Sequence, residues 1–309
     1  MFGCGGLNLL NMAKEARHAM NMSYKAQRRI VIVTFLTLPL VLLLLFTYYP
    51  ALMLVYYSFT DWDGFGFKNI DYVGFDNYID IFTNPEYFQI LRNNAYYFIG
   101  GLVQTALALL FAVILNTKLR GRNLFRVVLF LPYILHSVAI AIMFQTVYHS
   151  TYGSLNLLLE KLGLESLKQL WLGNPAINDW SLAFVSMWMY LGYNMVIFLG
   201  SLQSISDDWY EAARIDGANA WQQFWHITMP SIKSVLNLML ILTLSGALQA
   251  FVVPYIMTLG ANDTSTFLMK TLDVAFKFNQ FGLASALAVV LLLMVAIVVG
   301  LQRVVLKEE

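Results

Sequence analysis

The chain has 309 residues, of which 59% are hydrophobic and only 12% are charged, and its formal net charge is +1. Soluble domains carry about 25% charged residues, so this composition excludes a water-soluble surface over most of the chain and predicts a membrane protein. No basic stripe lies outside the flanks of the apolar runs, which argues against a nucleic-acid-binding protein.

Six apolar stretches are long enough to cross a hydrocarbon core of about 30 Å, which takes about 20 helical residues. Lipid offers no partner to free backbone groups, and apolar runs of this length without alternation favour helices. The predicted spans are residues 30–59, 95–116, 124–148, 180–203, 234–259 and about 282–302. We therefore expect an all-α membrane protein with about six transmembrane helices. In the first of them, Pro39 and Pro50 are expected to kink the helix or end it early.

The distribution of positive charge predicts the orientation of the spans. Thirteen of the 19 Lys and Arg residues fall in segments 1–29, 117–126, 204–233 and the C-terminal end, which lie on one side of a six-span chain. The positive-inside rule then places both termini on the cytoplasmic side of the membrane, which we expect to be a bacterial plasma membrane. The expected organisation is a tail over 1–29, one transmembrane domain over 30–303, and a tail over 304–309. The lone cysteine, Cys4, excludes an intrachain disulfide, and its role stays open.

Two connecting segments have a composition of their own. Residues 60–94 combine several acidic and aromatic residues, which predicts a folded outer loop. Residues 155–162 form an amphipathic pattern that predicts a helix lying at the outer interface.

Several groups required for other functions are missing from the sequence. No Asp, Glu or Lys lies deep within a predicted span, which argues against a proton-coupled pump. His136, expected in the middle of the third span, has no second His or Cys to form a metal set, so we interpret it as a packing residue. The sequence contains no phosphate-binding loop and no nucleophile–base motif. We therefore predict neither an enzyme nor a cofactor in this chain.

The most unusual segment, residues 206–230, lies between the fourth and fifth predicted spans. Ser206 is a good N-cap, and the two aspartates after it suit the first turn of a helix. Gly217 can end that helix with a left-handed residue, and Pro230 suits the start of the next helix. The pattern predicts a short cytoplasmic helix, a turn and a second helix that offer a small contact face.

Here the sequence resembles a known family. The segment is similar to the EAA motif of binding-protein-dependent ABC importer permeases, in which this loop is a coupling helix that docks on the ATPase subunit. The matching residues are Glu211, Ala212, Ala213, Asp216, Gly217, Ala218, Ile227 and Pro230. The resemblance implies a second permease subunit, two ATPase subunits that bind ATP and magnesium, and an extracellular solute-binding protein.

Further motifs resemble the carbohydrate-uptake branch of that family, among them Tyr49-Pro50 and the stretch from Val73 to Tyr78. Near the C-terminal end, Ala261-Asn262-Asp263 replaces a Gly-Gly-Pro that is common in the branch. The fourth span is also similar to the corresponding helix of the larger maltose-transporter permease. That resemblance implies a substrate pathway lined by Trp188, Tyr193, Asn194 and Gln249.

The alternative for Trp188 and Tyr193 is packing between helices. The two residues are five apart, which offsets them by about 140° on a straight helix, so one shared cavity requires a bend, for which Gly192 offers a place. The predicted function is import of a sugar or oligosaccharide. The chain itself is expected to be surrounded by membrane lipid. An ABC permease for another solute, such as a glycerol phosphate, and a membrane enzyme or assembly factor remain the alternatives.

Overall fold

The computed structural model describes residues 24–66, 70–117 and 119–305. Cys4, most of the predicted N-terminal tail and residues 306–309 lie outside this part of the chain. By compactness the chain divides into two units, residues 1–56 and 57–309, which are described separately. The predicted boundaries at residues 30 and 303 stay predictions.

The first unit is built from α2 (Tyr24–Leu43), η1 (Leu44–Tyr48) and α3 (Tyr49–Tyr57), which form one continuous apolar run. Of the two expected effects, a kink or an early end, the early end is wrong, because the helix passes through Pro39 and Pro50. η1 is a turn of π-helix in which the Tyr49 N–H donates to the Leu44 carbonyl, five residues back. Such a wide turn makes room for a proline ring, which otherwise meets the carbonyl four residues before it.

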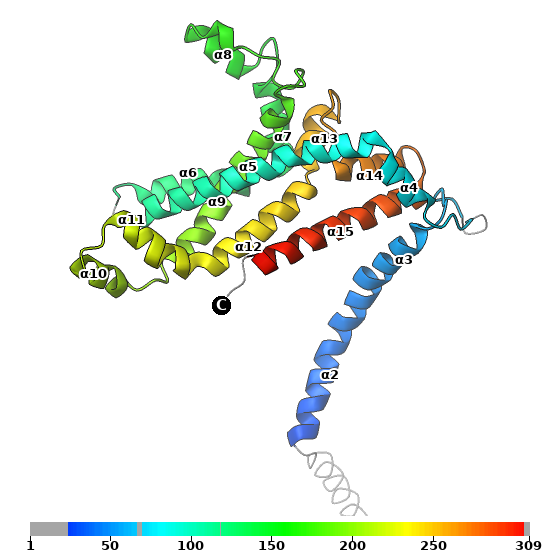
Figure 1. Cartoon of the computed structure of the whole chain (residues 1–309), viewed down its shortest axis with the longest axis horizontal. Helices are drawn as coiled ribbons and strands as arrows, with labels where there is room; N and C mark the ends of the chain where they lie inside the picture. Colours follow the sequence, from blue (N-terminus) through cyan, green and yellow to red (C-terminus); the bar gives the residue numbers. More distant parts are fainter. Residues whose placement is uncertain (1–23, 67–69, 118, 306–309) are drawn as a thin grey trace, which may run out of the picture. The chain divides into compact units, whose positions relative to one another are not determined.

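The second unit is a layer of long helices (Figure 1). They are α5 (Pro85–Asn116), α9 (Asn178–Leu202), α12 (Met229–Leu248) and α15 (Phe281–Val305). In this layer α5 packs on α9, and α12 packs on α5, α9 and α15. Five helices in the described part of the chain are long and apolar enough to span a membrane, and a bent pair makes a sixth. The expected all-α fold with about six spans is confirmed.

The bent pair corrects the third predicted span. Instead of one helix over 124–148, the chain forms α6 (Arg122–Ile134) and α7 (Ser137–Val147), which meet at 98°. Leu135 and His136 between them adopt extended backbone conformations. His136 is therefore not a mid-helix packing residue, because its Nδ1 accepts from the Val138 N–H at 3.3 Å and caps α7.

The two connecting segments are folded, as predicted. Thr60 and Tyr72 form an isolated bridge, and α4 (Asp76–Thr83) follows. The Asn84 side chain then accepts from the Glu86 N–H at 3.0 Å, so α5 begins ten residues before the predicted position. The amphipathic stretch forms α8 (Ser154–Lys161), followed by the short turn η2 (Glu165–Leu167).

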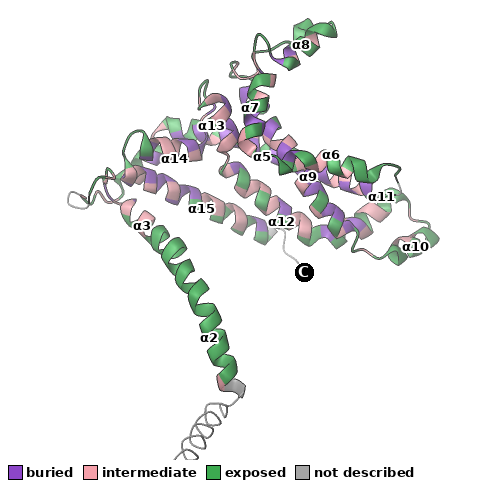
Figure 2. Ribbon diagram, turned by 180° about the vertical axis from the view of Figure 1, so that it is seen from behind, coloured by how far each residue is buried: buried purple, intermediate pink, exposed green. Residues whose placement is uncertain are grey.

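The core of the second unit has two clusters around α9 and a third between α5, α14 (Phe267–Phe276) and α15 (Figure 2). α9 is one continuous helix, without a break at Gly192, the place that we offered for a bend. Gly192 serves close packing instead, since a Cβ at this position would lie 2.0 Å from the backbone oxygen of Leu129 on α6. At Gly200, on the same helix, a Cβ would meet no neighbour within 4 Å.

Replacing these two glycines with alanine is therefore expected to have opposite effects. Gly192→Ala forces α6 away from α9, and overpacking of this kind costs about 1–3 kcal/mol. Gly200→Ala favours the helix by up to about 1 kcal/mol, because alanine loses less backbone entropy than glycine. Thermal unfolding of the purified proteins in detergent is expected to show a lower Tm for Gly192→Ala and an unchanged or higher Tm for Gly200→Ala. Equal Tm values would contradict this account of Gly192.

Candidate functional site

The segment after α9 begins with the short helix α10 (Asp207–Ile215). The Ser206 hydroxyl accepts from the Asp208 N–H at 3.3 Å, as expected of an N-cap. Gly217 ends the helix with a φ of +83°, the left-handed conformation predicted for it. The Ala218 N–H then donates to the Ala213 carbonyl at 2.8 Å, which closes the helix end.

The chain returns to the long helices through α11 (Ala220–Gln223) and η3 (Phe224–Thr228). Asn219 starts this return with a reciprocal capping box to Gln222. The Tyr210 hydroxyl lies 2.9 Å from the Thr228 hydroxyl and ties α10 to η3. η3 is a second π-turn, placed before Pro230 in the first turn of α12. The segment is therefore a defined element that is joined without a break to a long helix.

α10 and η3 enclose a groove of about 300 Å³. It brings together five of the eight residues predicted for ATPase coupling, although Ile227 lies nine residues beyond the others in sequence. These are Ala213, Asp216, Gly217, Ala218 and Ile227. Glu211 and Ala212 lie on the exposed surface of α10, and Pro230 begins α12. The exposed Glu211–Arg214 pair, at 3.9 Å, adds little stability.

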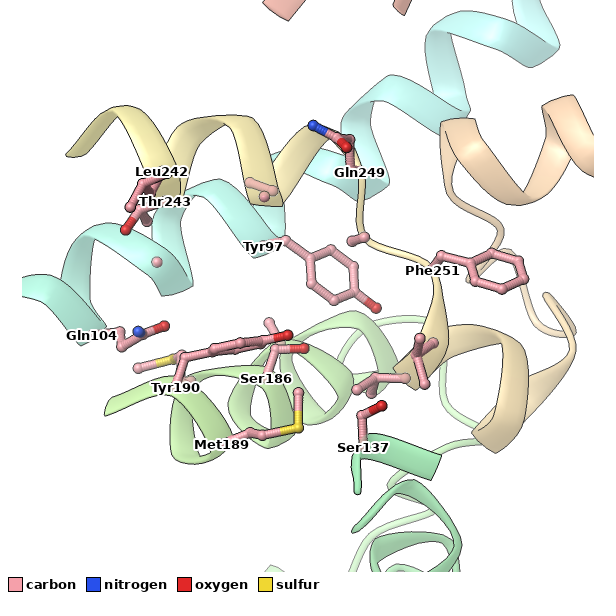
Figure 3. Close-up of a pocket in the computed structure, with 18 of the residues that line it drawn as sticks. Tyr97, Gln104, Ser137, Ser186, Met189, Tyr190, Leu242, Thr243, Gln249 and Phe251 are labelled. Atoms are coloured by element: carbon pink, nitrogen blue, oxygen red, sulfur yellow. The ribbon is translucent and has the colours of Figure 1, made fainter. Parts of the chain in front are cut away.

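A second site is a cavity of about 370 Å³ in the layer of long helices (Figure 3). α5, α9, the end of α12 and the start of α13 (Val252–Thr258) line it. The polar side chains in its wall are Tyr97, Gln104, Ser137, Ser186, Tyr190, Tyr193, Asn194, Thr243 and Gln249. None of the described residues in the wall is charged. The cavity offers hydroxyl, amide and aromatic groups without an ion-pairing partner.

Three of the four residues predicted for the substrate pathway meet in this wall: Tyr193, Asn194 and Gln249. Trp188 is not among the lining residues. Its ring packs edge-to-face on Phe144, with 5.3 Å between ring centroids. On the straight helix α9, Trp188 lies on another face than Tyr193, as the 140° offset requires. The placement of Trp188 agrees with the packing alternative.

The cavity lies where α12 ends and α13 begins, because residues 249–251 leave the helix. Broken backbone in a membrane span needs internal hydrogen-bond partners. Asn94 of α5 supplies them: its Nδ2 donates to the Ala247 and Leu248 carbonyls at 2.8 and 3.1 Å. Its Oδ1 accepts from the Phe267 N–H at 3.0 Å, which starts α14 (Phe267–Phe276). Asn94 thus joins the ends of two other helices to α5.

The loop between α13 and α14 is held in the same way. Asn93 Nδ2 donates to the Ser265 carbonyl at 2.9 Å and to the Asp263 carbonyl, and Asn178 Nδ2 donates to the Asn262 carbonyl at 2.7 Å. Asn262 and Asp263 have φ values of 55° and 63°. Asn and Asp tolerate this left-handed conformation, so this pair can turn the chain without a glycine.

Several cavity residues were missed from the sequence. On α5, Tyr97, Gly101 and Gln104 are spaced i, i+4 and i+7, so they form one helix face, and all three line the cavity. This polar stripe within an apolar helix was a readable signal. Ser137 was not predictable as a lining residue, because its position depends on the bend between α6 and α7.

Comparison with known proteins places this architecture in a family. The family model described as "binding-protein-dependent transport system inner membrane component" matches residues 104–308. The probable ABC transporter permease protein YurN of Bacillus subtilis is 38% identical over 275 residues, which cover 86% of this chain and 92% of YurN. The multiple sugar-binding transport system permease protein MsmF of Streptococcus mutans is 32% identical over 87% of this chain and 92% of MsmF.

A further permease relative and a solved transporter structure support the same family assignment and fold. The diacetylchitobiose uptake system permease protein NgcF of Streptomyces coelicolor is 32% identical over 83% of this chain and 76% of NgcF. A solved bacterial ABC transporter for import of the acidic polysaccharide alginate has the same fold, with a TM-score of 0.79 at 20% identity over 91% of this chain and 96% of that one. The chain, a multi-pass membrane protein and not an enzyme, therefore belongs to the family of binding-protein-dependent transport system inner membrane components, the permeases of ABC transporters.

Proposed function

We propose that this permease carries an uncharged sugar or oligosaccharide into the cell. The observation that supports this most strongly is the wall of the 370 Å³ cavity, which combines hydroxyl, amide and aromatic side chains and contains no charged one among the described residues. A sugar presents C–H faces that pack on aromatic rings and hydroxyl groups that bond to fixed polar groups. Tyr193, Asn194 and Gln249 are the proposed contacts from α9 and the end of α12.

The relatives named for sugars support the same substrate class. MsmF is named for multiple sugars and NgcF for diacetylchitobiose, and each aligns with more than four fifths of this chain. The alginate transporter is named for an acidic polysaccharide, but at 20% identity it supports the fold alone. A phosphate or carboxylate substrate is best bound by Arg or Lys, so the uncharged wall disfavours a glycerol phosphate.

We propose that energy coupling uses the segment from Ser206 to Pro230. This chain has no phosphate-binding loop of its own, so ATP has to be hydrolysed by separate subunits. The groove between α10 and η3 gathers small residues that leave room for close approach of a partner. The proposed complex holds this chain, a different second permease, two ATPase subunits and a solute-binding protein.

The proposed orientation places the α10 segment and both chain ends in the cytoplasm. The excess of Lys and Arg in the segments on that side supports it. In intact cells, a membrane-impermeant thiol reagent is expected to label Asp76→Cys, an exposed position at the start of α4, and to spare the exposed Asn219→Cys. Labelling of the second variant from outside would refute the orientation.

Sugar uptake tests the proposed function directly. Cells that lack this chain are compared with cells that carry it, using radiolabelled maltose, melibiose, raffinose and diacetylchitobiose. At least one of these neutral sugars is expected to lose uptake in the deficient cells and to regain it with the wild-type chain. Excess glycerol phosphate is not expected to compete, because the cavity wall offers it no cation.

The outcome that opposes the proposal is equally clear. If loss of this chain leaves uptake of all four sugars unaffected, the assignment to sugars fails. A loss of glycerol phosphate uptake in the same cells would then show that the permease serves an anionic solute.

Substitutions of Gly217 test the proposed coupling segment. No atom lies within 4 Å of a Cβ built at Gly217, so its left-handed φ and not crowding restricts the position. Gly217→Val places a β-branched residue in this conformation, which costs roughly 1–2 kcal/mol and distorts the end of α10. Gly217→Asn is the control, because Asn tolerates a positive φ. We expect a loss of sugar-stimulated ATP hydrolysis of about tenfold in the first variant and near-normal activity in the second; equal activity in both would count against this segment as the coupling element.

A further inference from the structure

A buried tyrosine in the cavity wall has a hydroxyl group without a partner. Tyr97 of α5 is only 5% exposed, and its hydroxyl makes no hydrogen bond within the described part of the chain. A buried polar atom without a partner destabilises a fold. A phenylalanine would fill the same space without that cost, so the packing of the helices does not account for the hydroxyl.

The direction of the side chain gives the hydroxyl a place to act. Figure 3 shows the Tyr97 ring standing between α9 and the segment after Gln249, with its hydroxyl directed into the space near Ser186 and Ser137. The ring itself belongs to a buried cluster with Ala183 and Val253, which fixes its position. A rigid ring therefore holds one polar atom toward the cavity.

Tyr97 also adds a contact from a side of the cavity to which none of the predicted contacts belongs. Tyr193 and Asn194 come from α9, and Gln249 comes from the end of α12, whereas Tyr97 and Gln104 come from α5. The hydroxyl groups of a sugar point in several directions, so a site that distinguishes sugars needs polar groups on more than one side. A phenol can donate one hydrogen bond and accept another, which suits a sugar hydroxyl.

We propose that the Tyr97 hydroxyl hydrogen-bonds a hydroxyl group of the transported sugar and that Tyr97 is a specificity-determining residue of this permease. The inference rests on the sugar-transport function proposed above. A site built to bond one hydroxyl group discriminates against the analogue that lacks it, because the protein group is then left buried and unpaired.

Tyr97→Phe is the test variant, since it keeps the ring and removes only the hydroxyl. Tyr96→Phe is the matched control: this neighbour packs edge-to-face on Trp180, with 4.9 Å between centroids, and does not line the cavity. Both are expressed as full-length chains in the deficient cells, with membrane protein levels measured by immunoblot. The probes are maltose, melibiose, raffinose and diacetylchitobiose, followed by the monodeoxy derivatives of each sugar that the wild type carries.

For a carried sugar, initial uptake below saturation is expected to fall about tenfold in Tyr97→Phe and to stay unchanged in Tyr96→Phe. For one monodeoxy derivative, the wild type and Tyr97→Phe are expected to be equal, because the sugar hydroxyl that Tyr97 binds is absent from it. An undiminished rate in Tyr97→Phe, or an equal loss for every derivative at normal protein levels, overturns the inference and leaves sugar transport standing. If the wild type carries none of the four sugars, the proposed function fails and this inference fails with it.

Discussion

The arrangement of helices in the second unit, residues 57–309, depends on the hydrogen bonds of Asn94. This side chain satisfies two carbonyls at the end of α12 and the N–H that starts α14, all from α5. Each of these groups, left buried without a partner, costs about 1–3 kcal/mol. Thr266 adds a third contact to the break, because its hydroxyl donates to the Ala250 carbonyl at 2.6 Å, so Asn94 and Thr266 together hold residues 249–251 in an apolar environment. The neighbouring Asn93 holds the loop before α14, so one turn of α5 organises both irregular segments.

The break has a direct consequence for the cavity. It ends α12 at Leu248 and brings Gln249 and the following residues into the cavity wall. The other end of the same helix continues into η3, whose Ile227 lines the groove beside α10. A helix of 20 residues is about 30 Å long and stiff. The proposed ATPase contact and the proposed sugar site are therefore joined by one rigid element, which gives movement at α10 a physical route to the cavity.

Features set by local chemistry were predictable from the sequence. The apolar spans, the Ser206 cap and the left-handed Gly217 all follow from interactions within a few residues, and the structure has each of them. Features set by tertiary contact were not predictable. The bend at His136 interrupts an apolar run that contains Pro132 but no glycine, and the proline alone does not fix the 98° angle. Gly192 was offered as a place for a bend, whereas its close contact with Leu129 depends on another helix and could not be read from the sequence.

Some residues of the cavity could also be predicted from the sequence and others could not. Tyr193, Asn194 and Gln249 were found through a family resemblance, and that resemblance also suggested Trp188, whose ring packs elsewhere. Tyr97 lies on α5, where no motif drew attention to it. Its polar stripe with Gln104 follows the helical period, but only the packing of α5 on α9 shows that the stripe faces a cavity and not lipid.

The number of sugar molecules transported per ATP hydrolysed in Asn94→Asp tests most directly whether α12, held at its end by Asn94, links the ATPase to the cavity. The aspartate keeps an acceptor for the Phe267 N–H but loses both donor bonds to α12. Asn84→Asp makes the same chemical change at the α5 N-cap, where Asp caps as well as Asn, and serves as the control. The account predicts that ATP hydrolysis persists in Asn94→Asp while the ratio falls, and that the control keeps the wild-type ratio. An unchanged ratio in Asn94→Asp would contradict it.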